Sequence, residues 1–200
     1  MQQDISFKNS KGSNLHGVLV TPETKHYPLV IICHGYASNT NSKTRVVLAD
    51  KLLEHGIASF GFDFTGCGKS DGELFQLTIT QGLDDLNAAY NYVNNLDGIN
   101  KNKISLLGSS FSGAVAVLFA INNELNTLLL KSPVSNYNQI KEVPLVTRNK
   151  QQQFFDDAKK YDVYSASEKI KIPTIKNPPT GGFFKYQRLL LEQPFTIANR

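Results

Sequence analysis

The sequence predicts an α/β protein in which a mostly parallel β-sheet carries helices on its faces. Short apolar segments rich in β-branched residues alternate with longer segments of helical periodicity, which is typical of parallel strands joined by crossover helices. The segment 28–33 is continuously apolar, as expected of a strand that is buried on both faces. Two turns of small residues, at 34–39 and 108–113, each follow a predicted strand directly. Ligands of open α/β sheets bind at the carboxyl ends of the strands, so we expect a site where these two turns meet.

The individual elements follow from local signals. The helix at 43–55 has Ser42 as a suitable N-cap and Gly56 as its stop. The helix at 80–94 places apolar residues at i, i+3 and i+4, with two aspartates in its first turn that suit the helix dipole. We expect strands at 15–20, 28–33, 57–62, 103–107 and 127–130, and helices at 43–55, 80–94 and 114–121.

The last third of the chain is less regular. Residues 134–168 are polar with a helical pattern and no sheet pattern, and 169–174 resemble the lead into one more strand. The sequence Asn177-Pro178-Pro179 interrupts that strand. We therefore divide the chain into a core at 1–174 and a tail of different composition at 175–200.

The composition limits the class of protein. With 200 residues, of which 40% are hydrophobic, the chain is long enough for one domain with a sizeable core. No apolar stretch approaches the roughly 18 residues of a membrane span, and the first residues lack the basic and apolar regions of a secretory signal. Two cysteines, Cys33 and Cys67, make neither a disulfide framework nor a zinc site. These features favour a cytoplasmic protein.

The basic character is concentrated in the tail. The formal net charge is +4 and the pI about 9.0, which raises the question of nucleic-acid binding. The residues from 169 onward hold one acid, Glu192, and six bases: Lys169, Lys171, Lys176, Lys185, Arg188 and Arg200. The remainder of the chain is close to neutral, so we expect no nucleic-acid partner.

The turn at 108–113 has the chemistry of a nucleophile site. Gly108 and Ser112, two residues before and two after Ser110, are small enough for a sharp passage from strand to helix, and Gly113 follows. Such a turn lifts the hydroxyl of Ser110 above the carboxyl edge of the sheet, where the helix dipole stabilises a developing anion. The pattern G-x-S-x-G has glycine where this chain has Ser112, which is small enough to be tolerated but makes the match to the pattern looser. A turn without chemistry is the alternative interpretation.

The turn at 34–39 complements it. Gly35 allows the chain to fold back across the sheet edge, which offers the N–H of Tyr36 to an oxyanion beside the N–H of Phe111. His34 taken alone is more often a residue that caps a turn than a catalytic group. Two such turns at one sheet edge favour a functional site there over turns without chemistry.

A third segment, Asp63 to Gly72, contains Gly-Lys-Ser after a strand and therefore suggests a phosphate-binding P-loop. The first glycine of that motif would fall at 63, where the chain has aspartate. A helix should also begin at Lys69-Ser70, whereas Asp71-Gly72 breaks the chain there. A nucleotide-binding protein is thus the weaker alternative.

Together these motifs resemble those of the α/β-hydrolase superfamily. His34-Gly35, the D-x-x-G-x-G-x-S stretch from Asp63 to Ser70 and the turn at Ser110 follow in the same order and spacing, and Lys131-Ser132-Pro133 and the segment 162–173 also match. The resemblance covers about residues 1–174 and is greatest to the bacterial esterase/lipase-like and serine-aminopeptidase-like branch.

The resemblance implies an α/β-hydrolase fold with Ser110 as nucleophile, Tyr36 and Phe111 as oxyanion-hole donors, and a cap or lid at 134–168. The substrates implied are esters, thioesters or short peptide amides, with no cofactor and no metal. The C-terminal part of the family pattern is missing or replaced, because 175–200 contains neither the expected His-Gly-Asp segment nor the final histidine. A frameshifted reading frame and a genuine replacement helix at 183–192 both remain open.

The catalytic acid and base are not found. In this family the triad runs serine, acid, histidine along the chain, and no histidine follows His55. His26 precedes a strand, His16 lies within one and His55 ends a helix, so only His34 comes near Ser110, and its place in the oxyanion turn argues for a structural role. Three acids, Asp156, Asp157 and Asp162, are expected on a solvated face.

We therefore expect a serine hydrolase that is impaired or inactive as this chain. A non-catalytic ligand-binding pseudoenzyme is the first alternative. We also expect self-association through an incomplete sheet edge, because unpaired strand edges and exposed apolar surface promote it.

Overall fold

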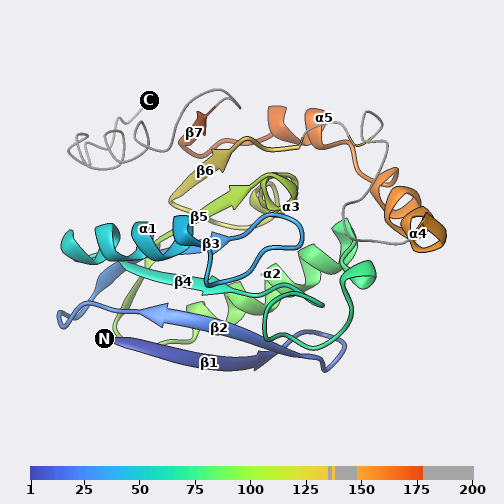
Figure 1. Cartoon of the computed structure of the whole chain (residues 1–200). Helices are drawn as coiled ribbons and strands as arrows, with labels where there is room; N and C mark the ends of the chain where they lie inside the picture. The colour runs from blue at the N-terminus through green and yellow to red at the C-terminus, as the bar shows by residue number, and fades with distance from the viewer. Residues whose placement is uncertain (135–136, 138–147, 178–200) are drawn as a thin grey trace.

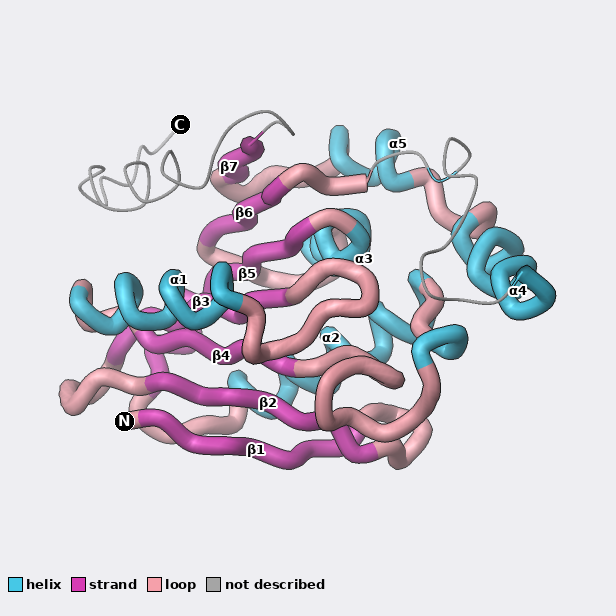
Figure 2. Tube along the Cα trace, in the orientation of Figure 1, coloured by secondary structure: helices cyan, strands magenta, loops and turns pink. Residues whose placement is uncertain are grey.

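The computed structural model describes residues 1–134, 137 and 148–177. Within them, seven strands form one sheet in the order β1-β2-β4-β3-β5-β6-β7 (Figures 1 and 2). The strands are β1 (Gln2–Lys8), β2 (Asn14–Val20), β3 (Tyr27–Cys33), β4 (Ala58–Phe62), β5 (Ile99–Ser109), β6 (Thr127–Lys131) and β7 (Thr174–Asn177). The helices are α1 (Lys43–Glu54), α2 (Ile79–Asn94), α3 (Phe111–Ala120), α4 (Arg148–Ala158), α5 (Val163–Glu168) and the short 3-10 helix η1 (Leu74–Gln76).

The sheet is mixed at one end and parallel through the rest. Strand β2 pairs antiparallel with both β1 and β4. The five strands β4, β3, β5, β6 and β7 run parallel to one another. The mostly parallel sheet predicted from sequence is confirmed. Because β3 and β5 lie side by side and in parallel, the turns that follow Cys33 and Ser109 emerge at the same edge.

Strand β3 divides the core into two layers. Alternate residues of a strand face opposite sides of a sheet. Val30 and Ile32 pack in one apolar cluster with Leu48 and Leu52 of α1, whereas Leu29 and Ile31 belong to the large cluster that contains the apolar residues of α2 and α3. Helix α1 thus covers one face and α2 and α3 cover the other, as Figure 1 shows.

The predicted elements recur with small shifts at their ends. Ser42 is the N-cap of α1, since its hydroxyl accepts the N–H of Arg45, and the chain leaves the helix through Gly56 with a φ of 69°. Helix α3 begins at Phe111, three residues earlier than expected, because the turn at Ser110 passes directly into the helix. Strand β1 was not predicted: its only apolar residues are Ile5 and Phe7, an alternation too short to indicate a strand.

The segment expected to be polar and helical contains α4 and α5, and β7 follows it as the expected further strand. Parts of that segment at 135–136 and 138–147 lie outside the described residues, as does the tail at 178–200. No helix of the described part is long and apolar enough to cross a membrane. Both cysteines are buried and free, and burial raises the pKa of Cys67 to about 12.

Candidate active site

Ser110 occupies a strained turn between β5 and α3. Its backbone has φ 55° and ψ −116°, a left-handed conformation that is costly for a residue with a side chain. Its own N–H donates to the carbonyl of Lys131, and its carbonyl accepts the N–H groups of Gly113 and Val134. The residue itself is exposed. The surrounding backbone therefore holds the strained conformation and presents the hydroxyl to solvent.

The glycines on either side are required by close packing. A Cβ atom at Gly108 would lie 2.4 Å from the carbonyl oxygen of Ser112, and one at Gly113 would lie 2.7 Å from the Cα of Pro133. Both neighbouring atoms belong to the backbone, so they cannot move aside cheaply. The chain can make this turn only with glycine at both positions.

Ser112, which stands where the G-x-S-x-G pattern has glycine, is bonded into the turn. It is fully buried. Its Oγ accepts the N–H of Ser109 at 2.8 Å and lies 2.8 Å from the carbonyl oxygen of Cys33, to which the hydroxyl can donate. The carbonyl of Ser109, at 3.1 Å, is a second possible acceptor. The hydroxyl thereby joins the turn at Ser110 to the end of β3.

The turn after β3 passes directly beside Ser110. A Cβ atom built on Gly35 would lie 3.5 Å from the Cβ of Ser110. Neither the N–H of Tyr36 nor that of Phe111 donates to any described residue. The structure thus brings Ser110 and the turn that carries Tyr36 together, and it leaves two backbone donors near the serine without a partner in the described part of the chain.

His34 is committed to its own turn. Its Nδ1 lies 2.7 Å from the carbonyl oxygen of Gly35, which can only accept, and its Nε2 lies 3.1 Å from the N–H of Phe64, which can only donate. These contacts require the neutral tautomer with the proton on Nδ1. Burial lowers the pKa of His34, although the carbonyl of Gly35 and the charge of Asp63 oppose that effect. With both nitrogens engaged, His34 is unsuited to remove a proton from Ser110.

The other histidines lie in different contacts. His16, in β2, places Nδ1 3.0 Å from Asp63 and Nε2 2.9 Å from Asp4. His26 lies in the turn before β3 with a φ of 59°, and His55 is the C-cap of α1. None of their described contacts involves Ser110.

The segment after β4 encloses a carboxylate of the protein itself. Asp63 is fully buried, and its carboxylate accepts the N–H groups of Thr40 at 2.6 Å and Lys69 at 3.0 Å. A Cβ atom at Gly68 would lie 2.2 Å from Asp63 Oδ2, so this loop closes around the side chain. The next elements are η1 and α2, and no helix begins at Lys69. The geometry of a P-loop is absent from this segment, and the nucleotide-binding alternative loses its support.

One of the three acids expected on a solvated face is instead buried. Asp157 accepts both the N–H and the hydroxyl of Thr80, at the start of α2, and its charge is also contacted by Lys160 at 3.0 Å. Burial alone would raise the pKa of Asp157, but these hydrogen bonds outweigh it and the pKa lies below its usual range. Asp156 is exposed, and Asp162 caps α5 by accepting the N–H of Ser165. Asp157 therefore joins α4 to α2, whereas the bonds of Asp156 and Asp162 lie within their own segments.

Aromatic residues of the following segment cover the turn at Tyr36. Phe154 of α4 packs edge-on against Tyr36, with ring centroids 5.7 Å apart, and against Phe111 at 6.2 Å. Tyr137 contacts Phe154 in turn, and the hydroxyl of Tyr36 donates to the carbonyl of Leu74. Phe154 was not among the predicted site residues, since two adjacent phenylalanines in an otherwise polar helix do not reveal the partners of either one.

Among the described residues, no cluster of three or more histidine, cysteine or acidic side chains could hold a metal ion.

Solved structures with this architecture define the class of protein. The fold is similar to that of Est1E from Butyrivibrio proteoclasticus, solved with ferulic acid bound, with a TM-score of 0.77 at 18% identity over 94% of this chain and 96% of that one. It is also similar to the esterase Pf2001 of Pyrococcus furiosus, with a TM-score of 0.70 at 19% identity over 88% of this chain and 70% of that one. The protein has the α/β-hydrolase fold.

The family follows from the sequence match. Residues 24–174 match the family model described as serine aminopeptidase, S33, and the chain belongs to that family of α/β-hydrolases. It is 30% identical over 136 residues to the quorum-quenching protein AidA of Acinetobacter baumannii, a match that covers 66% of this chain and 44% of the relative. It is 29% identical over 117 residues to the mitochondrial palmitoyl-protein thioesterase ABHD10 of Rattus norvegicus, covering 58% and 33%. The chain spans less than half of the length of these two relatives.

Proposed function

We propose that Ser110 is the nucleophile of an acyl-transfer reaction on carboxylic esters, thioesters or short peptide amides. The observation that carries the proposal is the strained backbone of Ser110, which presents an exposed hydroxyl at the amino-terminal end of α3. Strain of this kind persists only where the surrounding structure imposes it, and it concentrates at functional sites. The names of an esterase and a thioesterase among the similar proteins support the same class of substrate.

The proposed reaction has two steps. Ser110 Oγ attacks the carbonyl carbon, its proton passes to the departing alcohol, thiol or amine, and an acyl-serine ester remains. Water then cleaves that ester and restores the serine. The N–H groups of Tyr36 and Phe111 would stabilise the negative oxygen in both steps, since preorganised backbone donors are worth about 3–4 kcal/mol each in such sites.

We further propose that this chain catalyses the reaction poorly. Both nitrogens of His34 are occupied, and the described contacts of the other histidines lie elsewhere, so no histidine of the described part of the chain is in place to take the proton of Ser110. Loss of the histidine of a catalytic triad costs a factor of roughly 10⁶ in kcat, and about 10³–10⁴ over water remains from the oxyanion hole and binding.

Labelling with a fluorophosphonate followed by mass spectrometry tests the nucleophile. We expect slow modification of Ser110 that is lost in Ser110→Ala and kept in Ser109→Ala, a matched neighbour. Modification at another residue, or equal labelling of both variants, would refute the assignment. A turnover of p-nitrophenyl acetate above about 1 per second that depends on Ser110 would refute the proposed impairment.

A non-catalytic ligand-binding protein is the second candidate, favoured by the engagement of both His34 nitrogens. It predicts that an ester or amide binds with the same affinity in Ser110→Ala and that no acyl-enzyme forms. Trapping an acyl group on Ser110 would exclude it.

Two further properties are proposed on weaker grounds. The two buried, free thiols are consistent with a reducing compartment and hence with the cytoplasm. Self-association is the second, through the edge of the sheet beyond β7, and light scattering that shows a stable monomer at all concentrations would contradict it.

A further inference from the structure

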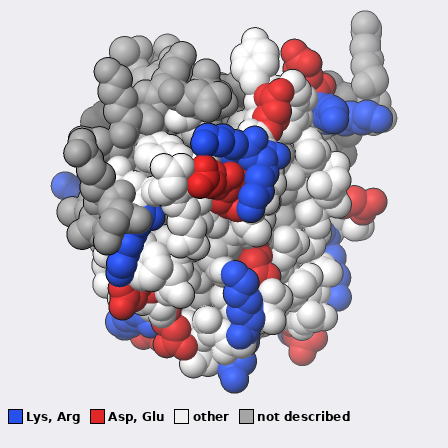
Figure 3. Space-filling model, turned by 90° about the vertical axis from the view of Figure 1, so that its right-hand side faces the viewer, with Lys and Arg blue, Asp and Glu red and all other residues white. Residues whose placement is uncertain are grey.

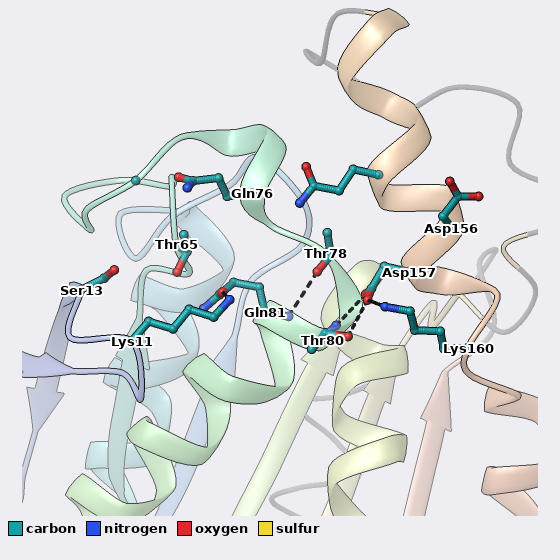
Figure 4. A pocket seen from close by; sticks show the side chains of 12 residues that line it. Lys11, Ser13, Thr65, Gln76, Thr78, Thr80, Gln81, Asp156, Asp157 and Lys160 are labelled. Atoms are coloured by element: carbon teal, nitrogen blue, oxygen red, sulfur yellow. Dashed lines mark hydrogen bonds and ion pairs between the residues drawn. The ribbon is translucent and has the colours of Figure 1, made fainter.

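A polar hollow of about 580 Å³ lies where α4 meets the amino-terminal end of α2 (Figure 4). Its walls come from four segments: the hairpin between β1 and β2, the loop after β4, the start of α2, and α4. The volume is within the range of pockets that hold small molecules. The hollow therefore has the size of a binding site and joins parts of the chain that are far apart in sequence.

The hollow is separate from the proposed acyl-transfer site. Neither Ser110 nor the two proposed oxyanion donors line it. The short helix η1 stands between them: the carbonyl of Leu74 accepts the hydroxyl of Tyr36, whereas Gln76, at the other end of η1, lines the hollow. A ligand here would not occupy the space at the nucleophile.

The charges that line the hollow sum to zero, and each charged group has a hydrogen-bonding partner, although the partner of Lys11 is the uncharged amide of Gln81. Two lysines and two aspartates line it. Lys11 Nζ lies 2.6 Å from Gln81 Oε1, and Lys160 Nζ lies 3.0 Å from Asp157. Figure 3 shows acidic and basic side chains intermingled over this end of the molecule. The surface thus offers no excess of either sign to attract a charged ligand.

Uncharged hydrogen-bonding groups remain available. Seven of the twelve lining residues carry a hydroxyl or an amide side chain. The amide of Gln153 and the hydroxyl of Ser13 bond to no described residue, and Gln76 uses only its oxygen, which accepts the N–H of Glu73. Hydroxyl and amide groups both donate and accept, which matches the hydroxyl groups of a polyol.

We propose that this hollow binds an uncharged, polyhydroxylated molecule of the sugar type between α4 and the core. Gln153 would contact it from α4, and Ser13 and Gln76 would contact it from the core. Because such a ligand touches both sides, it would stabilise the docking of α4, by an amount that grows with the logarithm of its concentration above Kd.

To test the proposal, the full chain is titrated with glucose, xylose and maltose as neutral probes. Binding is monitored through the NMR shifts of the backbone amides. Glucose 6-phosphate and glucosamine serve as charged counterparts. We expect at least one neutral sugar to give saturable shifts at residues of the hollow. Each of Gln153→Ala and Ser13→Ala should weaken binding roughly 3- to 10-fold, the effect of one lost hydrogen bond.

Asn91→Ala is the control, since Asn91 carries an amide side chain, is exposed on α2 and does not line the hollow. It should leave the affinity unchanged, and so should Ser110→Ala, which makes this test independent of the acyl-transfer proposal. Absence of saturable shifts with all three neutral sugars would overturn the proposal. Tighter binding of a charged counterpart, or equal affinity in Gln153→Ala and Ser13→Ala, would overturn it as well.

Discussion

The hydroxyl of Ser112 lies 2.8 Å from the carbonyl oxygen of Cys33, although the two residues are 79 positions apart. Cys33 ends β3, and the turn with Gly35 and Tyr36 follows it directly. The contact therefore joins that turn to the turn that carries Ser110. The separation between the proposed nucleophile and one proposed oxyanion donor is therefore fixed by a side chain that the G-x-S-x-G pattern lacks.

Removing that hydroxyl should destabilise the protein. In Ser112→Ala the N–H of Ser109 and the carbonyl of Cys33 lose a buried partner, which costs about 1–3 kcal/mol. Urea unfolding measures the change, with Ser109→Ala as the control, because the Ser109 hydroxyl makes no hydrogen bond to a described residue. Equal stability of Ser112→Ala and the unmodified chain would contradict the role given to Ser112.

A methyl group at Gly108 should be much more damaging than one at Gly35. The new Cβ would meet the backbone oxygen of Ser112 at 2.4 Å in Gly108→Ala, whereas in Gly35→Ala it would lie at an ordinary 3.5 Å from its neighbours. We expect Gly108→Ala to lose at least about 3 kcal/mol or to fail to fold, since the new methyl group would clash with backbone that cannot move aside. Thermal unfolding of both variants tests this. Similar melting temperatures would show that the turn at Ser110 has room for a Cβ atom at Gly108.

Acidification should weaken the fold through His34. Burial lowers the pKa of its imidazole in the folded state, so the unfolded chain binds the proton more readily. The stabilisation is complete above the unfolded value of about 6.5 and is lost as the pH falls from there toward the lowered folded value, with a slope of at most about 1.4 kcal/mol per pH unit.

Unfolding free energies measured from pH 7.5 to 5 check this prediction. His34→Gln should show a shallower slope over that range, whereas His55→Gln, at the exposed end of α1, should keep the original one. A steeper slope in His34→Gln would show that the sign is wrong.

Truncation of Phe154 should loosen the aromatic cover over the site. The side chain is 4% exposed and contacts Tyr36, Phe111 and Tyr137, so Phe154→Ala should cost about 3–5 kcal/mol. Hydrogen exchange at residues 34–38 should accelerate as well. Tyr164→Ala, at a residue that is 68% exposed in the next helix, is the control. Unchanged hydrogen exchange at 34–38 in Phe154→Ala would show that α4 does not stabilise the turn at Tyr36.

Replacing the carboxylate of Asp63 should disrupt the loop after β4. Asn at this position puts an amide group where an oxygen accepts N–H groups, so Asp63→Asn should lose roughly 3 kcal/mol through an unsatisfied buried contact. Asp97→Asn, at an exposed position, should be neutral. Calorimetry distinguishes them, and a neutral Asp63→Asn would mean that the loop does not depend on this acid.

The sequence alone determined the features that consecutive residues encode. The apolar run of β3, the caps of α1 and the glycines around Ser110 act within a few positions, so the strands, the helices and the elbow could be predicted, and with them the α/β-hydrolase fold. Only the tertiary structure decided which distant groups meet: β1 as a strand with one buried residue, Asp157 buried against Thr80, and Ser112 bound to Cys33. These contacts depend on the order of strands in the sheet, which brings together segments whose own sequences carry no sign of their partners.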